Sequence, residues 1–296
     1  MDLSKNVTRA KVPAGTAAKP PRKPALPGGN DYDTITVDVR ERVALVTLTR
    51  PLVRNAFDTT LVRELTQALA ALDGDAGVRA VVLLGEGESF SAGAESSSLQ
   101  EMAGYDEGRN LADAKELACM LRTLYLLGKP TIARVHGPVN GSGIGVIACC
   151  DIAFAEHNAT FSLPETKLGL IPAAIAPYVV EAIGARQARR YCISAEEFTA
   201  AEAFRIGLVH DICPLDELDG RINELLGSLL VAGPRAQAEA KALVRAVAAR
   251  PIDDAVIADT AARIARVRGS AEGKEGMSAF VDKRAPSWIP EALRDA

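Results

Sequence analysis

The order of secondary structure along the chain is the feature that most limits its fold. In the first half, short apolar segments rich in β-branched residues alternate with segments that are apolar at helical spacing. In the second half the helical pattern dominates. Strands joined by crossover helices, followed by helices alone, predict an α/β core with a helical C-terminal part. The predicted strands lie at 34–39, 43–48, 79–84, 131–135 and 151–155.

Local signals indicate where several of these elements begin and end. A hairpin is expected around residues 40–42, between the first two strands. Asp58 fits a helix N-cap, because apolar residues follow it at helical spacing from Leu61 to Leu72. Two capping-box spacings, at 194–197 and 199–202, predict helix starts, and the residues after Ala94 are expected to form a loop. Further helices are expected at 112–127, 215–231, 234–249, 252–268 and 273–284.

Composition excludes several classes of protein. The 296 residues are 48% apolar, which is enough for one large core or a core with a small appended domain. The net charge of −4 gives no overall positive field that would recruit nucleic acid or anionic lipid. No apolar run approaches the roughly 20 residues of a membrane span, and the N-terminus lacks an apolar signal-peptide core, so a cytoplasmic location is expected. Three histidines, and no Cys/His cluster at ligand spacing, argue against a metal site.

Residues 1–30 differ in composition from the rest of the chain. Six lysines and arginines lie there among prolines and glycines, and almost nothing in the segment can be buried. Such a composition cannot offset the entropy lost on ordering, so we expect a disordered arm. A basic tail that binds RNA or a membrane is the alternative interpretation.

Four segments, in this order and spacing, resemble the enoyl-CoA hydratase/isomerase (crotonase) superfamily. They are RNAF at 54–57, FSAGAE at 90–95, GPVNGSGIGVIACCD at 137–151 and FSLPETKLGLIP at 161–172. The likeness spans roughly residues 33–290, and residues 129–191 look closest to bacterial 3-methylglutaconyl-CoA and isohexenylglutaconyl-CoA hydratases. The resemblance implies an α/β spiral of ββα units stacked into two roughly perpendicular sheets. It also implies binding of an acyl-coenzyme A thioester.

The implied chemistry needs two backbone N–H groups that point at one oxygen. Adding water to a double bond conjugated to a thioester, or moving that bond, puts negative charge on the carbonyl oxygen. One donor to this oxyanion is typically worth about 3 kcal/mol. The resemblance assigns the donors to Ala94 and Ser142, and a helix starting near Ser142 would add its dipole. The family usually has glycine at 142, so we expect the Ser142 hydroxyl to crowd the carbonyl or to demand a different backbone angle. An ordinary strand-to-helix turn is the alternative for residues 137–145.

Glu165 is the predicted acid/base, because it matches the carboxylate of the family's Pro-Glu segment. Many hydratases of the superfamily carry a second glutamate where this chain has Gly145. Two carboxylates can divide acid and base work, so the loss of one raises the case for an isomerase or a member with altered chemistry. Glu95, Asp113 and Glu116 are possible replacements, although each also fits a solvated face or a helix cap.

Coenzyme A carries phosphates, so cations are expected beside it. The resemblance places Arg54, Ala56 and Ala92 at the nucleotide site. Lys283 matches a C-terminal lysine that in relatives reaches coenzyme A from an adjacent subunit, and Phe280 would pack near the adenine. Alternatively, Lys283 interacts with a helix dipole and Phe280 belongs to a helix core. Because coenzyme A is part of the substrate, no separate cofactor is expected.

The sequence therefore predicts three parts: an arm at 1–30, an acyl-CoA-binding core at 31–214 and a helical trimerisation part at 215–296. The expected assembly, by resemblance, is a homotrimer or a hexamer of stacked trimers. The favoured activity is hydration of a 2-enoyl-CoA. The Glu-Ser-Ser-Ser run after Ala94 suits a polar pocket for a carboxylated chain such as 3-methylglutaconyl, or simply a flexible loop. The alternatives are an enoyl-CoA Δ-isomerase that uses Glu165 alone, and a non-catalytic member that binds acyl-CoA or RNA.

Overall fold

Two sheets form the framework of the computed structural model, which describes residues 32–294. The larger sheet has the order β1-β2-β3-β4-β6-β9; β1 and β2 are antiparallel and the other neighbours are parallel. The smaller sheet has the order β5-β7-β8. The strands are β1 (Ile35–Arg40), β2 (Val43–Leu48), β3 (Ala80–Gly85), β4 (Thr131–Val135), β5 (Pro138–Asn140), β6 (Ile152–Glu156), β7 (Thr160–Ser162), β8 (Phe198–Thr199) and β9 (Asp211–Cys213).

The predicted hairpin is confirmed, with Arg40 paired to Val43 across a two-residue turn. Glu41 and Arg42 in that turn both have positive φ, 46° and 70°, as a turn that matches the twist of the strands requires. The five predicted strands are all present, within one or two residues of their expected ends. The short strands of the smaller sheet were not predicted, because three residues are too few to show a period.

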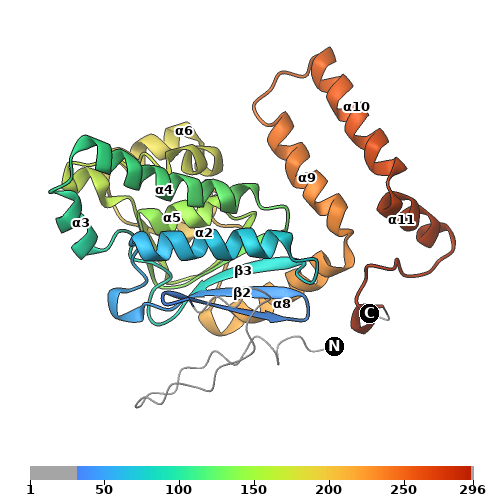
Figure 1. Cartoon of the computed structure of the whole chain (residues 1–296), viewed down its shortest axis with the longest axis horizontal. Coiled ribbons are helices and arrows are strands. Elements are labelled where there is room, and N and C mark those ends of the chain that lie inside the picture. Colours follow the sequence, from blue (N-terminus) through green and yellow to red (C-terminus); the bar gives the residue numbers. More distant parts are fainter. Residues whose placement is uncertain (1–31, 295–296) are drawn as a thin grey trace.

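Helices cover both faces of the larger sheet (Figure 1). Helices α2 (Thr59–Gly74) and α4 (Glu107–Leu126) lie on one face, and α8 (Leu215–Val231) lies on the other. Side chains of β3 alternate between the two: Val81 and Leu83 join the core under α2, whereas Ala80 and Val82 join the core under α8. This alternation gives the sheet two buried faces, as expected for strands joined by crossover helices.

Aspartate side chains cap the starts of α2 and α4. Asp58 Oδ1 accepts from Leu61 N at 2.7 Å, which confirms the predicted N-cap of α2. Helix α4 begins before the predicted residue 112, because Asp106 caps it. The stretch expected to be a loop after Ala94 is instead a short helix, α3 (Ser96–Met102). A 3₁₀ turn, η1 (Pro51–Val53), follows β2.

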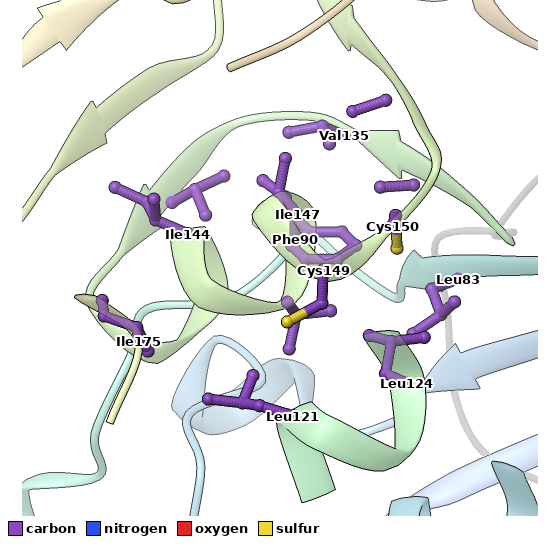
Figure 2. Close-up of a cluster of buried hydrophobic side chains, with 14 of the residues drawn as sticks. Leu83, Phe90, Leu121, Leu124, Val135, Ile144, Ile147, Cys149, Cys150 and Ile175 are labelled. Carbon is purple, nitrogen blue, oxygen red and sulfur yellow. The ribbon is translucent and has the colours of Figure 1, made fainter. Parts of the chain in front are cut away.

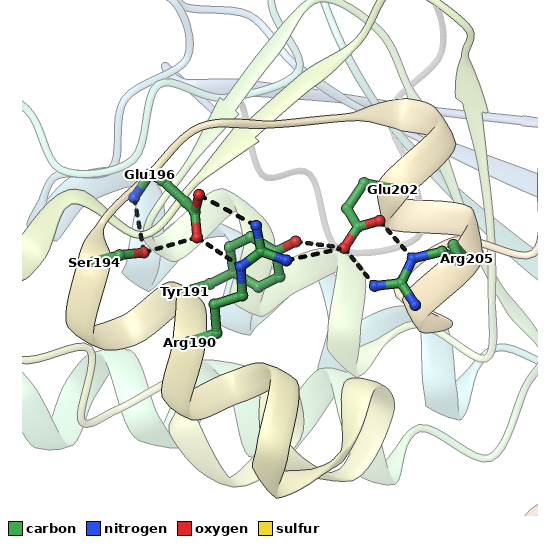
Figure 3. Close-up of polar contacts among 6 residues, drawn as sticks. All are labelled: Arg190, Tyr191, Ser194, Glu196, Glu202 and Arg205. Carbon is green, nitrogen blue, oxygen red and sulfur yellow. Dashed lines mark hydrogen bonds and ion pairs between the residues drawn. The ribbon is translucent and has the colours of Figure 1, made fainter.

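The turn between α6 (Ala176–Ser194) and α7 (Ala200–Ile206) corrects one of the two capping-box predictions. No helix starts at Ser194, which ends α6; its hydroxyl bonds Glu196 there (Figure 3). Thr199 does cap α7, since it accepts from Glu202 N at 3.3 Å. The Glu202 carboxylate does not complete the box. It binds Tyr191 Oη and Arg205 instead, which fastens α6 to α7.

Helix α5 (Ser142–Cys149) begins at the predicted residue and is enclosed by apolar side chains (Figure 2). Leu121 from α4, Leu83 from β3 and Phe90 pack on it in the main core. Ile175, which directly precedes α6, closes the cluster beside Ile144. The helix is thus held rigidly on the sheet, with its N-terminus at the loop that follows β5.

The last helices lie beside the core as a C-terminal helical extension (Figure 1). They are α9 (Pro234–Val247), α10 (Asp254–Gly269) and α11 (Ala271–Val281), followed by the 3₁₀ turn η3 (Glu291–Leu293). Lys241 anchors α9, because its ammonium lies 2.6 Å from Asp151 Oδ2 and 2.7 Å from Lys129 O. Large apolar side chains of this helical extension remain exposed, among them Ile257, Met277 and Phe280. None of the helices between residues 32 and 294 is long and apolar enough to cross a bilayer.

Candidate active site

The first proposed donor, the N–H of Ala94, lies in a loop held against Phe57. Phe57 N donates to Gly93 O at 2.6 Å, and Glu95 N donates to Phe57 O at 3.1 Å. In such a parallel bridge the middle residue directs its own N–H away from the partner strand. Ala94 is exposed, and its N–H has no acceptor among the residues that the structure describes. This amide is therefore free to bind a ligand.

The second proposed donor, the N–H of Ser142, opens helix α5. The first N–H groups of a helix have no intrahelical acceptor, and this one finds none elsewhere in residues 32–294. The left-handed backbone falls on Gly141, whose φ is 46°, and not on Ser142. Serine at 142 therefore demands no special backbone angle, and the expectation that it would is corrected on that point.

The loops that carry the two amides touch. A Cβ atom on Gly93 would lie 2.8 Å from Asn140 O, and one on Gly141 would lie 4.0 Å from Gly93 Cα. Only glycines allow so close an approach of two backbones. The structure thus brings the loops of Ala94 and Ser142 together at one place.

Glu165 lies at the same place. It belongs to the 3₁₀ turn η2 (Pro164–Leu168), and a Cβ atom on Gly141 would lie 2.8 Å from its Oε1. Its Oε2 is buried and accepts no hydrogen bond from any described residue. Burial raises the pKa of the carboxyl above its ordinary value. A half-buried acid with one buried, unpartnered oxygen beside an amide pair is suited to hold and release a proton.

Comparison with known proteins shows the family of the chain. The family described as enoyl-CoA hydratase/isomerase matches residues 38–291. The chain belongs to this family. It is 31% identical over 255 residues to 2,3-dehydroadipyl-CoA hydratase of Escherichia coli, covering 86% of this chain and 98% of the relative. It is also 31% identical over 256 residues to short-chain-enoyl-CoA hydratase of Clostridium acetobutylicum, covering 86% of this chain and 97% of the relative.

Solved structures agree with the sequence matches. The enoyl-CoA hydratase of Shewanella pealeana aligns with a TM-score of 0.85 and 39% identity, covering 87% of this chain and 96% of that chain. The predicted crotonase fold is therefore confirmed, and the chain is an enzyme of the enoyl-CoA hydratase/isomerase family.

At the position of the family's second carboxylate, this member has an apolar wall. A Cβ atom on Gly145 would lie 2.3 Å from Ile175 Cγ2 and 3.5 Å from Leu121 Cδ2. Ile175 is only 2% exposed, so it cannot swing away into solvent. The space for a side chain at 145 is therefore occupied by Ile175.

Of the other acids considered from the sequence, Glu95 is paired elsewhere and Glu116 is exposed. Glu95 lies 2.6 Å from the Arg50 guanidinium. The Ser97 hydroxyl and Arg50 hold the pKa of Glu95 below its ordinary value, so it stays ionised and paired. Asp113 and Glu116 lie on α4, where Glu116 is exposed.

The residues assigned to coenzyme A fall into two groups. Arg54, Ala56 and Ala92 adjoin the amide loop, because Ala92 N donates to Arg54 O at 2.8 Å and the Phe57–Ala94 bridge follows directly. Phe280 and Lys283 are exposed at the end of α11, which lies on the side of the molecule away from α3 and α6 (Figure 1). A single chain does not bring these two residues to Glu165.

Two positioning side chains were missed in the sequence. Asn55 is fully buried, and its amide donates to Glu86 O at 2.9 Å and Ser89 O at 2.8 Å. Arg50 donates to Ala56 O at 2.7 Å and pairs with Glu95. Asn55 lies within the RNAF segment, which was a usable signal. Arg50 directly precedes Pro51 and belongs to no recognisable motif, so its role could not be predicted.

Proposed function

We propose that this enzyme adds water to the 2,3 double bond of an enoyl-CoA. Glu165 acts as the acid/base, and the N–H groups of Ala94 and Ser142 bind the thioester oxygen. The observation that carries the proposal is the buried, unpartnered Oε2 of Glu165, on a carboxyl that touches Gly141. Gly141 precedes one amide and approaches the loop of the other, so the acid lies beside the loops that carry both donors.

One carboxylate is sufficient for this reaction. Ionised Glu165 takes a proton from water while the water oxygen bonds to C3, and the π electrons move onto the thioester oxygen. The two amides stabilise the resulting enolate, each donor typically contributing about 10²–10³ in rate. The enolate then collapses, and C2 takes the proton back from Glu165. Water adds to one face of the double bond, and Glu165 returns to its starting form.

Gly145 supports a second candidate, an enoyl-CoA Δ-isomerase. Ile175 occupies the space of a side chain at 145, so position 145 offers no second carboxylate to orient a water molecule. Glu165 would then remove a proton from C2 of a 3-enoyl-CoA and return it to C4. The same two amides would hold the dienolate between the two transfers.

The proposed substrate carries a branched, carboxylated acyl chain such as 3-methylglutaconyl. Two observations support this choice. Residues 129–191 resemble methylglutaconyl-type hydratases, and the E. coli relative is named for a dehydroadipyl chain, which also ends in a carboxylate. Coenzyme A enters as part of the substrate, and we propose no separate cofactor.

The proposed assembly is a homotrimer, or a hexamer of stacked trimers, in which Lys283 and Phe280 reach the coenzyme A of an adjacent subunit. Phe280 is 85% exposed and Val281 77% exposed, so the end of α11 presents an apolar surface. Contact with a second subunit would cover it and would bring Lys283 to a phosphate. Arg54, exposed beside the amide loop, would supply a cation from the same subunit.

A substrate panel tests these proposals. Crotonyl-CoA and 3-methylglutaconyl-CoA should lose their enoyl thioester absorbance, whereas gain of that absorbance from a 3-enoyl-CoA would identify the isomerase. Glu165→Gln should abolish turnover, and Glu116→Gln, an exposed acid on α4, is the matched control. Full activity of Glu165→Gln would overturn the acid/base assignment. Binding of acyl-CoA without any turnover would favour the non-catalytic alternative.

A further inference from the structure

Ser91 contacts both loops of the proposed oxyanion hole. It is fully buried. Its hydroxyl accepts from Gly93 N at 3.2 Å, one residue before Ala94. Its backbone oxygen accepts from Asn140 N at 3.0 Å, two residues before Ser142. Ser91 therefore binds the segments that lead to both amides. Its side chain binds the segment before Ala94, and its backbone binds the segment before Ser142.

The Ser91 hydroxyl is itself fixed in direction. It donates to Asn55 O at 2.8 Å, so its oxygen presents a lone pair to Gly93 N. Packing holds the other side: a Cβ atom on Gly143, in the first turn of α5, would lie 3.0 Å from Ser91 Cβ and 3.1 Å from Ser91 O. Ser91 therefore acts as a spacer between the Ala94 loop and α5.

We propose that Ser91 is a positioning residue that sets the direction of the Ala94 N–H relative to the Ser142 N–H. The proposal rests on the function above, in which these two amides bind the thioester oxygen. An oxyanion hole works only when both donors reach one oxygen without reorganisation. Ser91→Ala removes the hydroxyl but keeps the backbone bond to Asn140, so it loosens Ala94 and leaves Ser142 in place.

Kinetics separate positioning from stability. Ser91→Ala should lower kcat about tenfold or more, less than the loss of a whole donor, and should leave KM within about twofold. Ser91→Cys, which keeps a weak donor and acceptor in the same space, should recover part of the loss. Thr131→Val is the matched control. It deletes another fully buried hydroxyl, which donates to Asp151 Oδ2 at 2.8 Å. Thr131 lies at the start of β4, whereas the segment of Asn140 and Ser142 follows the end of that strand, so kcat should be unchanged.

The carbonyl stretch of bound butyryl-CoA, carrying ¹³C at the carbonyl, reports the donors directly. Wild type and Thr131→Val should shift this stretch to lower frequency, and Ser91→Ala should return it toward its value in water. An unchanged stretch and kcat in Ser91→Ala would overturn the role of Ser91, as would an equal loss in Thr131→Val. No shift in wild type would instead overturn the oxyanion hole itself, and with it any donor pair for Ser91 to align.

Discussion

Ile175 occupies the space that a side chain at position 145 would need. The Cβ atom of any residue other than glycine would lie 2.3 Å from Ile175 Cγ2, well inside van der Waals contact. Both residues are buried, and Ile175 precedes α6 whereas Gly145 lies within α5. Gly145 and Ile175 therefore form one structural unit. Because Ile175 fills this space, position 145 cannot carry a second acid.

Substitutions at these two positions should be strongly non-additive. Gly145→Glu forces a charged side chain into Ile175 and should cost about 3 kcal/mol or more of the free energy of unfolding. Ile175→Gly should cost about 3 kcal/mol through the cavity it leaves. The double variant should cost less than the sum by at least about 1 kcal/mol, because the new side chain fills the cavity. Urea denaturation of the four proteins measures this coupling, and additive losses would contradict the proposed unit.

The double variant also tests the chemistry. If its new carboxylate enters the site beside Glu165, the dependence of kcat/KM on pH should gain a second ionisation. Hydration should then rise relative to isomerisation, measured on matched 2-enoyl and 3-enoyl substrates. A pH profile identical to that of wild type would show that position 145 does not face the reacting atoms.

Glu165→Gln should stabilise the fold while it abolishes turnover. Burial raises the pKa of Glu165 in the folded protein. The folded state therefore binds this proton more tightly than the unfolded state, and wild type loses stability as pH rises from the ordinary glutamate pKa through the raised one. Glutamine carries no charge and avoids this loss, so the variant should be more stable than wild type at neutral pH. Thermal melts should converge at acidic pH, and a variant less stable than wild type at neutral pH would contradict the burial of an unpartnered charge.

Much of the framework could be predicted from local patterns. The hairpin turn, Asp58 as an N-cap and the start of α5 at Ser142 each follow from a few neighbouring residues. The Ser194 prediction failed because a capping box specifies only spacing. There Ala195 takes a left-handed conformation that ends α6, and Glu196 pairs with Arg190. Spacing alone could not show that partner.

The sequence named candidate residues for the site, but it could not show how they are connected. Glu165, Ala94 and Ser142 lie within recognisable segments, and the structure brings their loops together. Ile175 gave no signal, since an isoleucine in an apolar run shows nothing about which glycine it faces. The pairing of Glu95 with Arg50, which are 45 residues apart, also depends on tertiary structure.

Glu64 should make the protein sensitive to acid. It is 5% exposed and accepts from Thr34 Oγ1 at 2.6 Å and from Thr34 N at 2.9 Å. Burial opposes its charge, but these bonds and one from Asp33 N outweigh burial and lower its pKa. The contribution of Glu64 to the free energy of unfolding is therefore complete above the ordinary glutamate pKa, and it is lost as pH falls through the lowered pKa. Glu64→Gln should lose about 2 kcal/mol at neutral pH.

The loss should shrink in acid, where wild type is also protonated. Urea melts across that pH range measure it, with Glu116→Gln as a matched exposed control that should change little. If the loss of stability in Glu64→Gln stayed constant with pH, the shape of the Glu64 side chain, and not its charge, would hold the segment before β1 against α2.

Mixed assemblies should show whether Lys283 serves a neighbouring subunit. Lys283→Ala should raise KM about five- to tenfold through a lost phosphate contact, and Glu165→Gln should be inactive. When the two variants assemble together, a site that takes Glu165 from one subunit and Lys283 from the next is intact. Random mixing should restore about a quarter of the sites to wild-type KM, since each site needs one intact group from each of two subunits. Activity at low substrate concentration measures this recovery, and the unmixed variants are the control. If Lys283 served its own subunit, every active site would lack it, and mixing would leave KM at the raised value.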